Sequence, residues 1–253
     1  MLIIIFIRES FRLEKVIEIT NLNKVYKNGR GITDINLEIN RGDIFGFLGP
    51  NGAGKTTTMK IMTGLIKADS GDVKILGHSV IEDFEKAMKK VGCIIETAES
   101  YQYLTAYENL KQFSRYYKNV DDKRIEEVLD LTGILKYKNE KTGKFSLGMK
   151  QRLGIAAAIL SRPEVVILDE PFNGLDVEGM IDMRNIIKNM AKEEGTTFFI
   201  SSHLIHDVEL TCTKIGVLYG GKMLNVDTTK NILNNYATLE NYFVSEVEQN
   251  GRI

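Results

Sequence analysis

Residues 49–56 read Gly49-Pro50-Asn51-Gly52-Ala53-Gly54-Lys55-Thr56, which matches the phosphate-loop pattern G-x-x-x-x-G-K-T. The apolar run Ile44–Leu48 comes directly before this loop and is typical of a buried strand. The stretch that begins at Thr57 has the pattern of a first helical turn. A strand, a glycine-rich loop and a helix in this order form the context that a phosphate-binding loop requires.

The residue types of this loop suit a chain of phosphates. Glycines allow backbone N–H groups to converge on phosphate oxygens, because no Cβ blocks the approach. The start of the following helix adds a positive dipole end. We expect residues 49–57 to bind a nucleotide, with the Lys55 ammonium at the β- and γ-phosphates and the Thr56 hydroxyl on Mg²⁺. The alternative is a chance match to the pattern.

A second part of the same site follows a later apolar run. Val165–Leu168 is typical of a buried strand, and Asp169, Glu170 and Pro171 come directly after it. Side chains at the carboxyl end of a parallel strand point into the ligand crevice of the sheet. We expect Asp169 to hold hydrated Mg²⁺ and Glu170 to orient and polarise an attacking water. The alternative is a solvated turn after a strand.

Composition limits the class of protein. The 253 residues are 43% hydrophobic, which suffices for one sizeable domain or a domain with a lobe. The formal net charge is −1, so the chain lacks the basic balance typical of nucleic-acid binding. Both cysteines, Cys93 and Cys212, lie in apolar stretches, where we expect small core residues rather than a disulfide or metal pair. This cysteine usage fits a reducing cytosol.

The sequence contains no apolar run that approaches the roughly 20 residues needed to span a bilayer. Met1–Ile7 is apolar, but it is too short to span, and the charges at Arg8 and Glu9 lie on the wrong side for a secretion signal. We expect residues 1–15 to be an extra edge strand or a dispensable leader. If the chain works at a membrane, it docks onto another protein there.

The remaining pattern predicts an α/β fold with a mostly parallel sheet. Residues 16–40 alternate apolar and polar side chains, which predicts an N-terminal antiparallel β subdomain. Strands and helices alternate from Val165 to Leu218, which predicts helices on both faces of a parallel sheet. We expect a core at 16–95 and 163–226, an inserted helical subdomain at 96–162 and a C-terminal helical tail at 227–253.

Several motifs in a fixed order carry a resemblance to a known family. After the phosphate loop come the helix-rich stretch, Ser146–Arg152 (SLGMKQR), Asp169-Glu170-Pro171, Asn173–Asp176 (NGLD) and Ser201–His203 (SSH). In this order they resemble the ATP-binding subunit of an ABC transporter, built on a P-loop NTPase (RecA-like) core. The sequence around Ile94–Glu96 and Phe145–Met149 resembles the branch that exports drugs and peptide antibiotics such as bacitracin and lantibiotics.

The resemblance implies roles for further residues. Tyr26 matches the aromatic that stacks on adenine, with an ordinary strand aromatic as the alternative. The run Ser146-Leu147-Gly148-Met149 matches the segment that contacts the γ-phosphate held by a facing subunit; the alternative is that Ser146 only caps a helix over 147–159. His203 matches a switch histidine that holds the phosphate and water geometry. Asp176 matches a residue that crosses the interface between two subunits.

This sequence departs from the family pattern at two places. The usual Leu-Ser-Gly-Gly-Gln segment is Phe-Ser-Leu-Gly-Met, so Leu147 and Met149 replace a glycine and a glutamine while backbone contacts stay possible. Glu96 aligns with a glutamine that touches Mg²⁺ and senses the membrane partner. A carboxylate can bind Mg²⁺ but also repels the γ-phosphate. We expect Glu96 to be a metal-side ligand and a coupling residue.

The function implied is an ATPase that binds ATP and Mg²⁺ and powers transport by a separate transmembrane permease. The implied partners are this permease and a second ATP-binding subunit, with no nucleic acid, at the cytoplasmic face of the membrane. One alternative is an ABC ATPase that acts on ribosomes or DNA; the single cassette and the charge of −1 disfavour it. A small-molecule kinase with the same loop would not need the Ser146–Met149 and Asn173–Asp176 segments.

Overall fold

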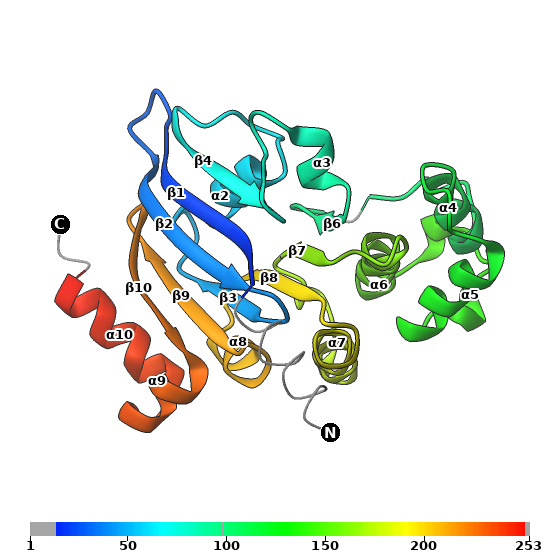
Figure 1. The fold of residues 1–253 in the computed structure, drawn as a ribbon. Helices are drawn as coiled ribbons and strands as arrows, with labels where there is room; N and C mark the ends of the chain where they lie inside the picture. Colours follow the sequence, from blue (N-terminus) through cyan, green and yellow to red (C-terminus); the bar gives the residue numbers. More distant parts are fainter. Residues whose placement is uncertain (1–13, 98, 251–253) are drawn as a thin grey trace, which may run out of the picture.

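A computed structural model describes residues 14–97 and 99–250 of the chain. Residues 1–13, where an edge strand or a leader is expected, lie outside this description. Figure 1 shows a sheet-rich body from which two helices, α4 (Ala106–Ser114) and α5 (Asp122–Leu131), extend to one side. None of the helices in the described part of the chain combines the length and the apolar character needed to cross a membrane.

A six-stranded sheet in the order β10-β9-β3-β8-β7-β6 forms the centre of the body. Its parallel strands are β3 (Ile44–Leu48), β6 (Val91–Ile94), β7 (Val165–Asp169), β8 (Thr197–Ser202) and β9 (Lys214–Tyr219). All residues of β3, β7 and β8 are buried, as expected for parallel strands that are covered on both faces. The predicted mostly parallel sheet is therefore confirmed.

A second, antiparallel sheet has the order β2-β1-β4-β5. Its strands are β1 (Lys15–Val25), β2 (Gly31–Asn40), β4 (Ser70–Ile75) and β5 (His78–Ser79). Buried and solvent-facing residues alternate along β2, and Ile17 of β1 pairs with Ile39 of β2. The alternation in the sequence therefore does mark antiparallel strands with one solvated face, as predicted.

Two apolar layers hold the sheets together. Phe45, Phe47 and Phe199 project from one face of the central sheet into a core shared with the antiparallel sheet and with α2 (Lys55–Met62). Their rings pack on one another, with Phe199 centred 5.2 Å from both other rings. Residues of alternate parity on the same strands, such as Ile44 and Leu48, enter the core on the opposite face.

That opposite face is covered by helices, and two of them begin at side-chain caps. They are α6 (Leu147–Ile159) and α7 (Val177–Asn189), capped by Ser146 and Asp176, with α8 (Ile205–Thr211). The helix α6 also contacts α4 and α5, which are capped by Thr105 and Asp121. The buried Arg124 guanidinium donates to the carbonyls of Ile159 and Leu160, so it ties α5 to the end of α6.

The C-terminal part contains a strand that the sequence pattern does not predict. β10 (Lys222–Thr228) pairs antiparallel with β9 across the turn Gly220-Gly221, where both residues have positive φ. Such a two-residue glycine turn is a hairpin signal. The expected start of the tail at residue 227 falls inside β10, and two helices follow, α9 (Thr229–Asn235) and α10 (Leu239–Asn250).

Three local expectations need correction. The Cys93 side chain is exposed rather than part of the core, because β6 is an edge strand of the sheet, whereas Cys212 is buried as expected. The helix expected near 81–90 is the shorter α3 (Phe84–Met88). The helix expected near 180–192 begins earlier, at the Asp176 cap, and ends in a π-helical turn over Met190–Glu194.

The Phe199 side chain provides a test of the core between the two sheets. We expect Phe199→Ala to lower the free energy of unfolding by about 3–5 kcal/mol, because a large buried ring is removed and a cavity remains. The matched control is Tyr116→Ala, at an aromatic residue that is 84% exposed. Denaturant unfolding followed by circular dichroism measures both; equal losses would contradict this view of the core.

Candidate functional site

The phosphate loop connects the end of β3 to the start of α2, and its backbone is closely confined. Gly54 has a φ of 111°, in the region that favours glycine, and a Cβ on it would lie 2.4 Å from Ile32 Cγ2. A Cβ on Gly49 would lie 2.3 Å from the Leu218 carbonyl oxygen. Larger residues at these two positions would therefore displace the loop.

Backbone groups of the loop are tied to the C-terminal hairpin as well. Ala53 is buried, and its carbonyl accepts a hydrogen bond from the Gly221 N–H at 3.1 Å. Pro50, Asn51 and Gly52 form the exposed rim of the loop. Thr57 lies in the first turn of α2. The loop is therefore held at its base and open at its rim, where a nucleotide would enter.

Tyr26 lies in the turn between β1 and β2 and is 41% exposed. Its N–H donates to the Arg30 carbonyl at 2.7 Å, which closes the turn directly before Gly31. A Cβ on Gly54 would lie 3.4 Å from the Gly31 carbonyl oxygen, so the end of this turn borders the phosphate loop. A flat, exposed ring next to this border fits the expected adenine contact.

The carboxyl ends of β7 and β8 place the oxygen ligands beside the loop. The Thr56 hydroxyl donates to Asp169 Oδ2 at 3.0 Å. The Ser201 hydroxyl donates to the other oxygen, Asp169 Oδ1, at 2.5 Å. The buried Asp169 carboxylate is thus oriented by one hydroxyl from α2 and one from β8.

These groups fit a magnesium ion that is bound with a nucleotide. The described residues contain no cluster of three or more His, Cys, Asp or Glu side chains that would hold a metal unaided. Mg²⁺ usually takes one or two protein oxygens and completes its octahedron with waters and substrate phosphates. Thr56 and Asp169 provide that set next to the loop.

Glu170 stands between the lysine of the loop and a histidine. Its Oε1 lies 3.5 Å from Lys55 Nζ, and its Oε2 lies 2.9 Å from His203 Nδ1. The Lys55 ammonium also donates to the Gly49 carbonyl at 2.7 Å. Glu170 has a φ of 50°, a left-handed value that is uncommon outside glycine and frequent at functional sites. The three expected catalytic side chains therefore meet at one place.

Glu96 lies apart from this cluster. It follows β6, its side chain is 60% exposed, and its Oε1 lies 2.7 Å from Lys60 Nζ on α2. Thr56 and Lys60 are four residues apart on α2, so they occupy the same face one turn from each other. The structure therefore places the Glu96 carboxylate on the face of α2 that carries Thr56, at the next turn.

The Ser146 segment lies against the turn that precedes α7. Ser146 Oγ accepts from the Met149 N–H at 3.3 Å, and Leu147 is 66% exposed. A Cβ on Gly174 would lie 2.4 Å from Leu147 Cδ2, so the two segments touch. Asp176 Oδ1 accepts from the Gly179 N–H at 2.8 Å and caps α7. Both predicted interface residues thus act as helix caps within this chain.

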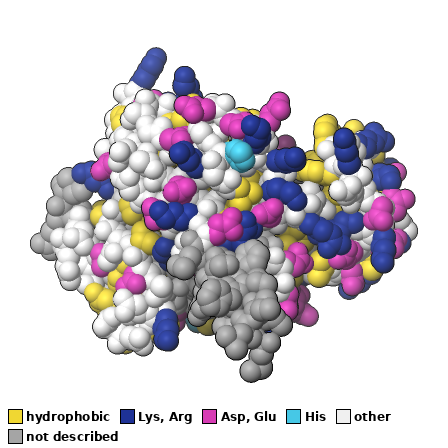
Figure 2. Space-filling model, in the orientation of Figure 1, with side chains coloured by type: hydrophobic (Ala, Val, Ile, Leu, Met, Phe, Trp, Pro, Cys, Tyr) yellow, Lys and Arg dark blue, Asp and Glu magenta, His cyan; other side chains and the backbone are white. Residues whose placement is uncertain are grey.

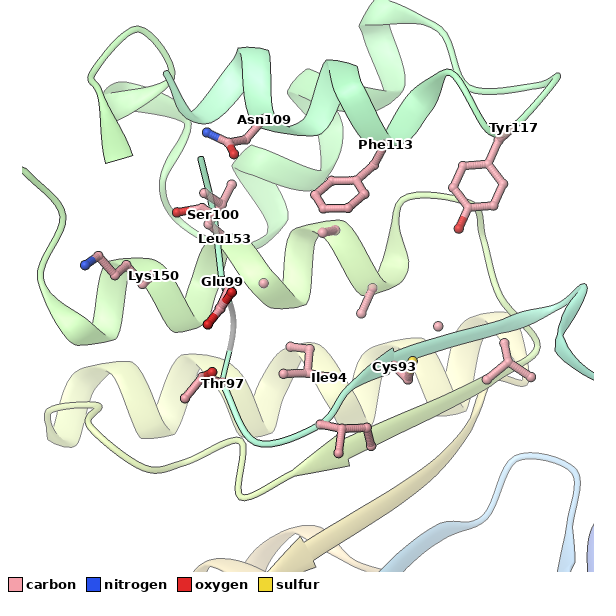
Figure 3. A pocket seen from close by; sticks show the side chains of 16 residues that line it. Cys93, Ile94, Thr97, Glu99, Ser100, Asn109, Phe113, Tyr117, Lys150 and Leu153 are labelled. Atoms are coloured by element: carbon pink, nitrogen blue, oxygen red, sulfur yellow. The ribbon is translucent and has the colours of Figure 1, made fainter. Parts of the chain in front are cut away.

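A groove of about 300 Å³ separates the edge of the central sheet from α4 and α6. Figure 3 shows Phe113 and Tyr117 pointing toward the strand that carries Cys93, with Lys150 on α6 at one end. The floor of the groove is largely apolar because β6, Leu153 and Ala157 form it. Thr97, the residue after Glu96, and Glu99 line the same groove.

Comparisons with known proteins agree with this geometry. The sequence profile of the family described as ABC transporter matches residues 32–173. An uncharacterised ABC transporter ATP-binding protein of Bacillus subtilis (strain 168) is 42% identical, over 94% of this chain and 77% of the relative. The chain belongs to the ABC transporter family. It is an ATP-binding cassette and an ATPase, as the sequence predicts.

Relatives and solved structures support the assignment of this ABC cassette. The bacitracin transport ATP-binding protein of Bacillus licheniformis is 42% identical, over 84% of this chain and 69% of that protein. A solved ATP-binding subunit of an ABC transporter matches with a TM-score of 0.83 and 26% identity, over 92% and 99% of the two chains. A dimeric ATP-binding cassette bound to ADP and Pi matches with a TM-score of 0.76 and 25% identity, over 84% and 98%. Cassettes of this family dimerise and work with transmembrane permeases.

At this ABC site, two side chains have roles that the sequence alone does not indicate. Ser201 orients Asp169 and also accepts from the Glu170 N–H at 3.0 Å, whereas the sequence shows it only as part of the Ser-Ser-His run. Its signal was a small hydroxyl at the end of a strand that neighbours the carboxylate strand. Lys60 carried no signal, because a lysine on a helix is ordinarily a solvated residue.

Removing the Ser201 hydroxyl tests whether it orients the carboxylates. Hydrogen bonds to charged groups contribute about 1.5–3 kcal/mol, so we expect Ser201→Ala to reduce ATP turnover by roughly ten- to a hundredfold. The matched control is Ser202→Ala, because the Ser202 hydroxyl accepts from the Leu204 N–H and alternation turns it to the other side of β8. Equal turnover of the two variants in a phosphate-release assay would contradict the role of Ser201.

Proposed function

We propose that the protein is an ATP-driven clamp that powers export through a separate transmembrane subunit, at the inner face of the cell membrane. The observation that carries this proposal is that the expected phosphate-binding residues lie at two separate places in the protomer. Lys55 and Thr56 meet the carboxylates of β7, whereas the Ser146 segment packs on the turn at Gly174. A second copy, placed head to tail, would bring its Ser146 helix end to the γ-phosphate.

The nucleotide would then link two protomers. Each ATP would lie between one phosphate loop and the opposing Ser146–Met149 segment, so it would supply contact area that neither protein surface has alone. Binding of ATP and dimerisation are therefore thermodynamically coupled, because a ligand that favours the closed pair stabilises it by mass action. The exposed Leu147 side chain would provide apolar contact where the family pattern has glycine.

Within each protomer, the roles follow from the contacts. Lys55 would neutralise phosphate charge, and Thr56 with Asp169 would hold Mg²⁺, which would supply positive charge to the reacting phosphates. Glu170 accepts the proton of the attacking water as its general base. The imidazole of His203 lies 2.9 Å from Glu170 and orients this carboxylate before nucleotide binds; with nucleotide bound, it would turn to donate to the γ-phosphate. The left-handed backbone at Glu170 fixes the direction of its side chain.

The groove between β6 and the helices α4 and α6 supports a docking site for the membrane subunit. It lies at the junction of the parallel-sheet core with the expected helical subdomain, and Glu96 marks the start of that subdomain. An apolar floor with charged residues at its margin suits an amphipathic segment. The relatives named for bacitracin and lantibiotic transport support a drug, peptide antibiotic or lipid-like molecule as the exported substrate.

The surface charge does not support nucleic acid as a binding partner. Figure 2 shows basic and acidic side chains interspersed over the face in view rather than gathered into a field of one sign. A net charge of −1 agrees with that pattern. Phosphate backbones are bound through many positive side chains, so the proposal of a membrane partner is favoured over the ribosome or DNA.

The first test uses the Glu170→Gln variant. We expect it to bind MgATP with an affinity near that of the wild type, to lose hydrolysis by on the order of a hundredfold or more, and to form a stable dimer. The neutral amide keeps the shape of the side chain but cannot accept the proton. Turnover is measured by phosphate release, and mass by sedimentation at saturating MgATP.

The control is the same variant with ADP, which lacks the γ-phosphate and is expected to leave monomers. Wild-type turnover in Glu170→Gln would remove Glu170 from catalysis. Monomers that persist with ATP occupancy proven would overturn the clamp.

A second test addresses the docking groove. We expect Phe113→Glu to reduce the amount of membrane subunit that co-purifies with the tagged protein by at least about threefold, because it places a charge against the apolar floor. The matched control is Tyr116→Glu, which introduces the same charge at an aromatic residue that does not line the groove. Equal recovery of the membrane subunit with both variants would refute docking at this groove.

A further inference from the structure

The chain makes an unusual turn at Glu96. The Thr97 N–H donates to the Ile95 carbonyl at 3.0 Å, and Glu96 between them has a φ of 67°. A hydrogen bond across three residues with positive φ at the centre is the rare, strained form of the γ-turn. Such conformations persist only where surrounding contacts hold them. At Glu96 the side chain makes such a contact, because it is paired with Lys60.

Lys60 is well placed to hold this turn. It belongs to α2, its side chain is 27% exposed, and its ammonium lies 2.7 Å from Glu96 Oε1. By contrast, the Glu96 side chain is 60% exposed. One partner is therefore anchored on the phosphate-loop helix, while the other is free to move once the pair breaks.

The segment after the turn is fixed to the helices beyond it. The Ser100 hydroxyl donates to Thr142 Oγ1 at 3.0 Å, and the Tyr101 N–H donates to Asn109 Oδ1 at 2.8 Å on α4. A movement of the backbone at Glu96 would therefore be transmitted to α4 through Ser100 and Tyr101. Among the described residues between β6 and these anchors, Glu96 is the one with positive φ.

Lys60 also sets how far Glu96 is from the nucleotide. Because Lys60 and Thr56 lie on one face of α2, the two positions are about 6 Å apart along the helix axis. The lysine that pairs with Glu96 is thus one helical turn along α2 from the residue whose hydroxyl would hold Mg²⁺. Two alternative partners for Glu96, the ammonium and the metal, lie along a single helix face.

We propose that Lys60 is a positioning residue that retains Glu96 in the strained turn until the magnesium nucleotide competes for its carboxylate. This inference rests on the proposed function, together with the expectation from the family resemblance that Glu96 is a metal-side ligand. Exchange of partners at Glu96 links occupancy of the phosphate loop to the position of α4. A partly exposed ion pair suits this purpose, because it contributes little stability and is readily replaced.

The first measurement needs neither metal nor nucleotide. Amide hydrogen exchange at Thr97 is followed by NMR or mass spectrometry in nucleotide-free protein. We expect Lys60→Met to speed this exchange about two- to fivefold, the range that corresponds to a partly exposed ion pair. Lys60→Arg keeps the charge and retains protection, and the charge-swapped pair Lys60→Glu with Glu96→Lys restores it. The matched control is Lys86→Met, at a lysine paired with Asp83 away from the site.

The second measurement is the dependence of ATP binding on Mg²⁺ concentration. We expect Lys60→Met to lower the Mg²⁺ concentration for half-maximal binding about two- to fivefold, because the ammonium no longer competes for Glu96. The same substitution in a Glu96→Gln background is expected to have no such effect. This difference between backgrounds separates positioning from a general change in stability, which would appear in both.

The outcomes divide cleanly. Unchanged Thr97 exchange in Lys60→Met, or an equal Mg²⁺ shift in both backgrounds, overturns the role of Lys60 even if the wild type hydrolyses ATP. A wild-type protein that binds no ATP would contradict the proposed function instead. The hydrogen-exchange result would still test Lys60 in that case, because it is measured in nucleotide-free protein. Faster exchange together with a Mg²⁺ shift that needs Glu96 supports the proposal.

Discussion

The register of the central parallel sheet is the constraint on which the site depends. Because β3, β7 and β8 run in the same direction, their carboxyl ends meet at one edge, with Leu48 beside Ser202 and Asp169 beside Ser201. The phosphate loop, the two carboxylates and His203 all leave the sheet at that edge. Strands that are buried on both faces cannot slip by one residue without moving their apolar side chains into the wrong layer. The packing of the core therefore fixes the geometry of the chemistry.

At that edge, the Asp169 carboxylate has fixed hydrogen-bond partners, whereas the neighbouring Glu170 contacts side chains that are expected to move when a nucleotide binds. Asp169 is buried and accepts from two hydroxyls. Glu170 contacts Lys55 and His203, both of which are expected to turn toward phosphate when a nucleotide arrives. Two adjacent acids thus differ through their surroundings. A rigid acid suits a metal ligand, and an acid whose neighbours rearrange suits a proton acceptor.

The strand–loop–helix unit, the antiparallel strands and the helix cap at Ser146 could be predicted, because each has a local sequence signal. The cap at Asp176 was not predicted, so the start of α7 was placed too late. Cys93 was misplaced because an apolar run does not tell an edge strand from a central one. The sequence does not predict β10, because its side chains do not alternate clearly between apolar and polar and the strand is defined by its pairing with β9. The Lys60–Glu96 pair spans two elements, and the partner of an exposed charge is set by tertiary structure.

The C-terminal hairpin has a consequence for how the protein is made. Gly221 donates its N–H to the Ala53 carbonyl and accepts from the Thr33 N–H, so the turn between β9 and β10 forms one wall of the phosphate loop. A growing chain therefore lacks this wall until the ribosome has released the hairpin, long after the loop itself has been synthesised. Nascent chains are therefore expected to acquire nucleotide affinity late, only after the C-terminal hairpin has been synthesised.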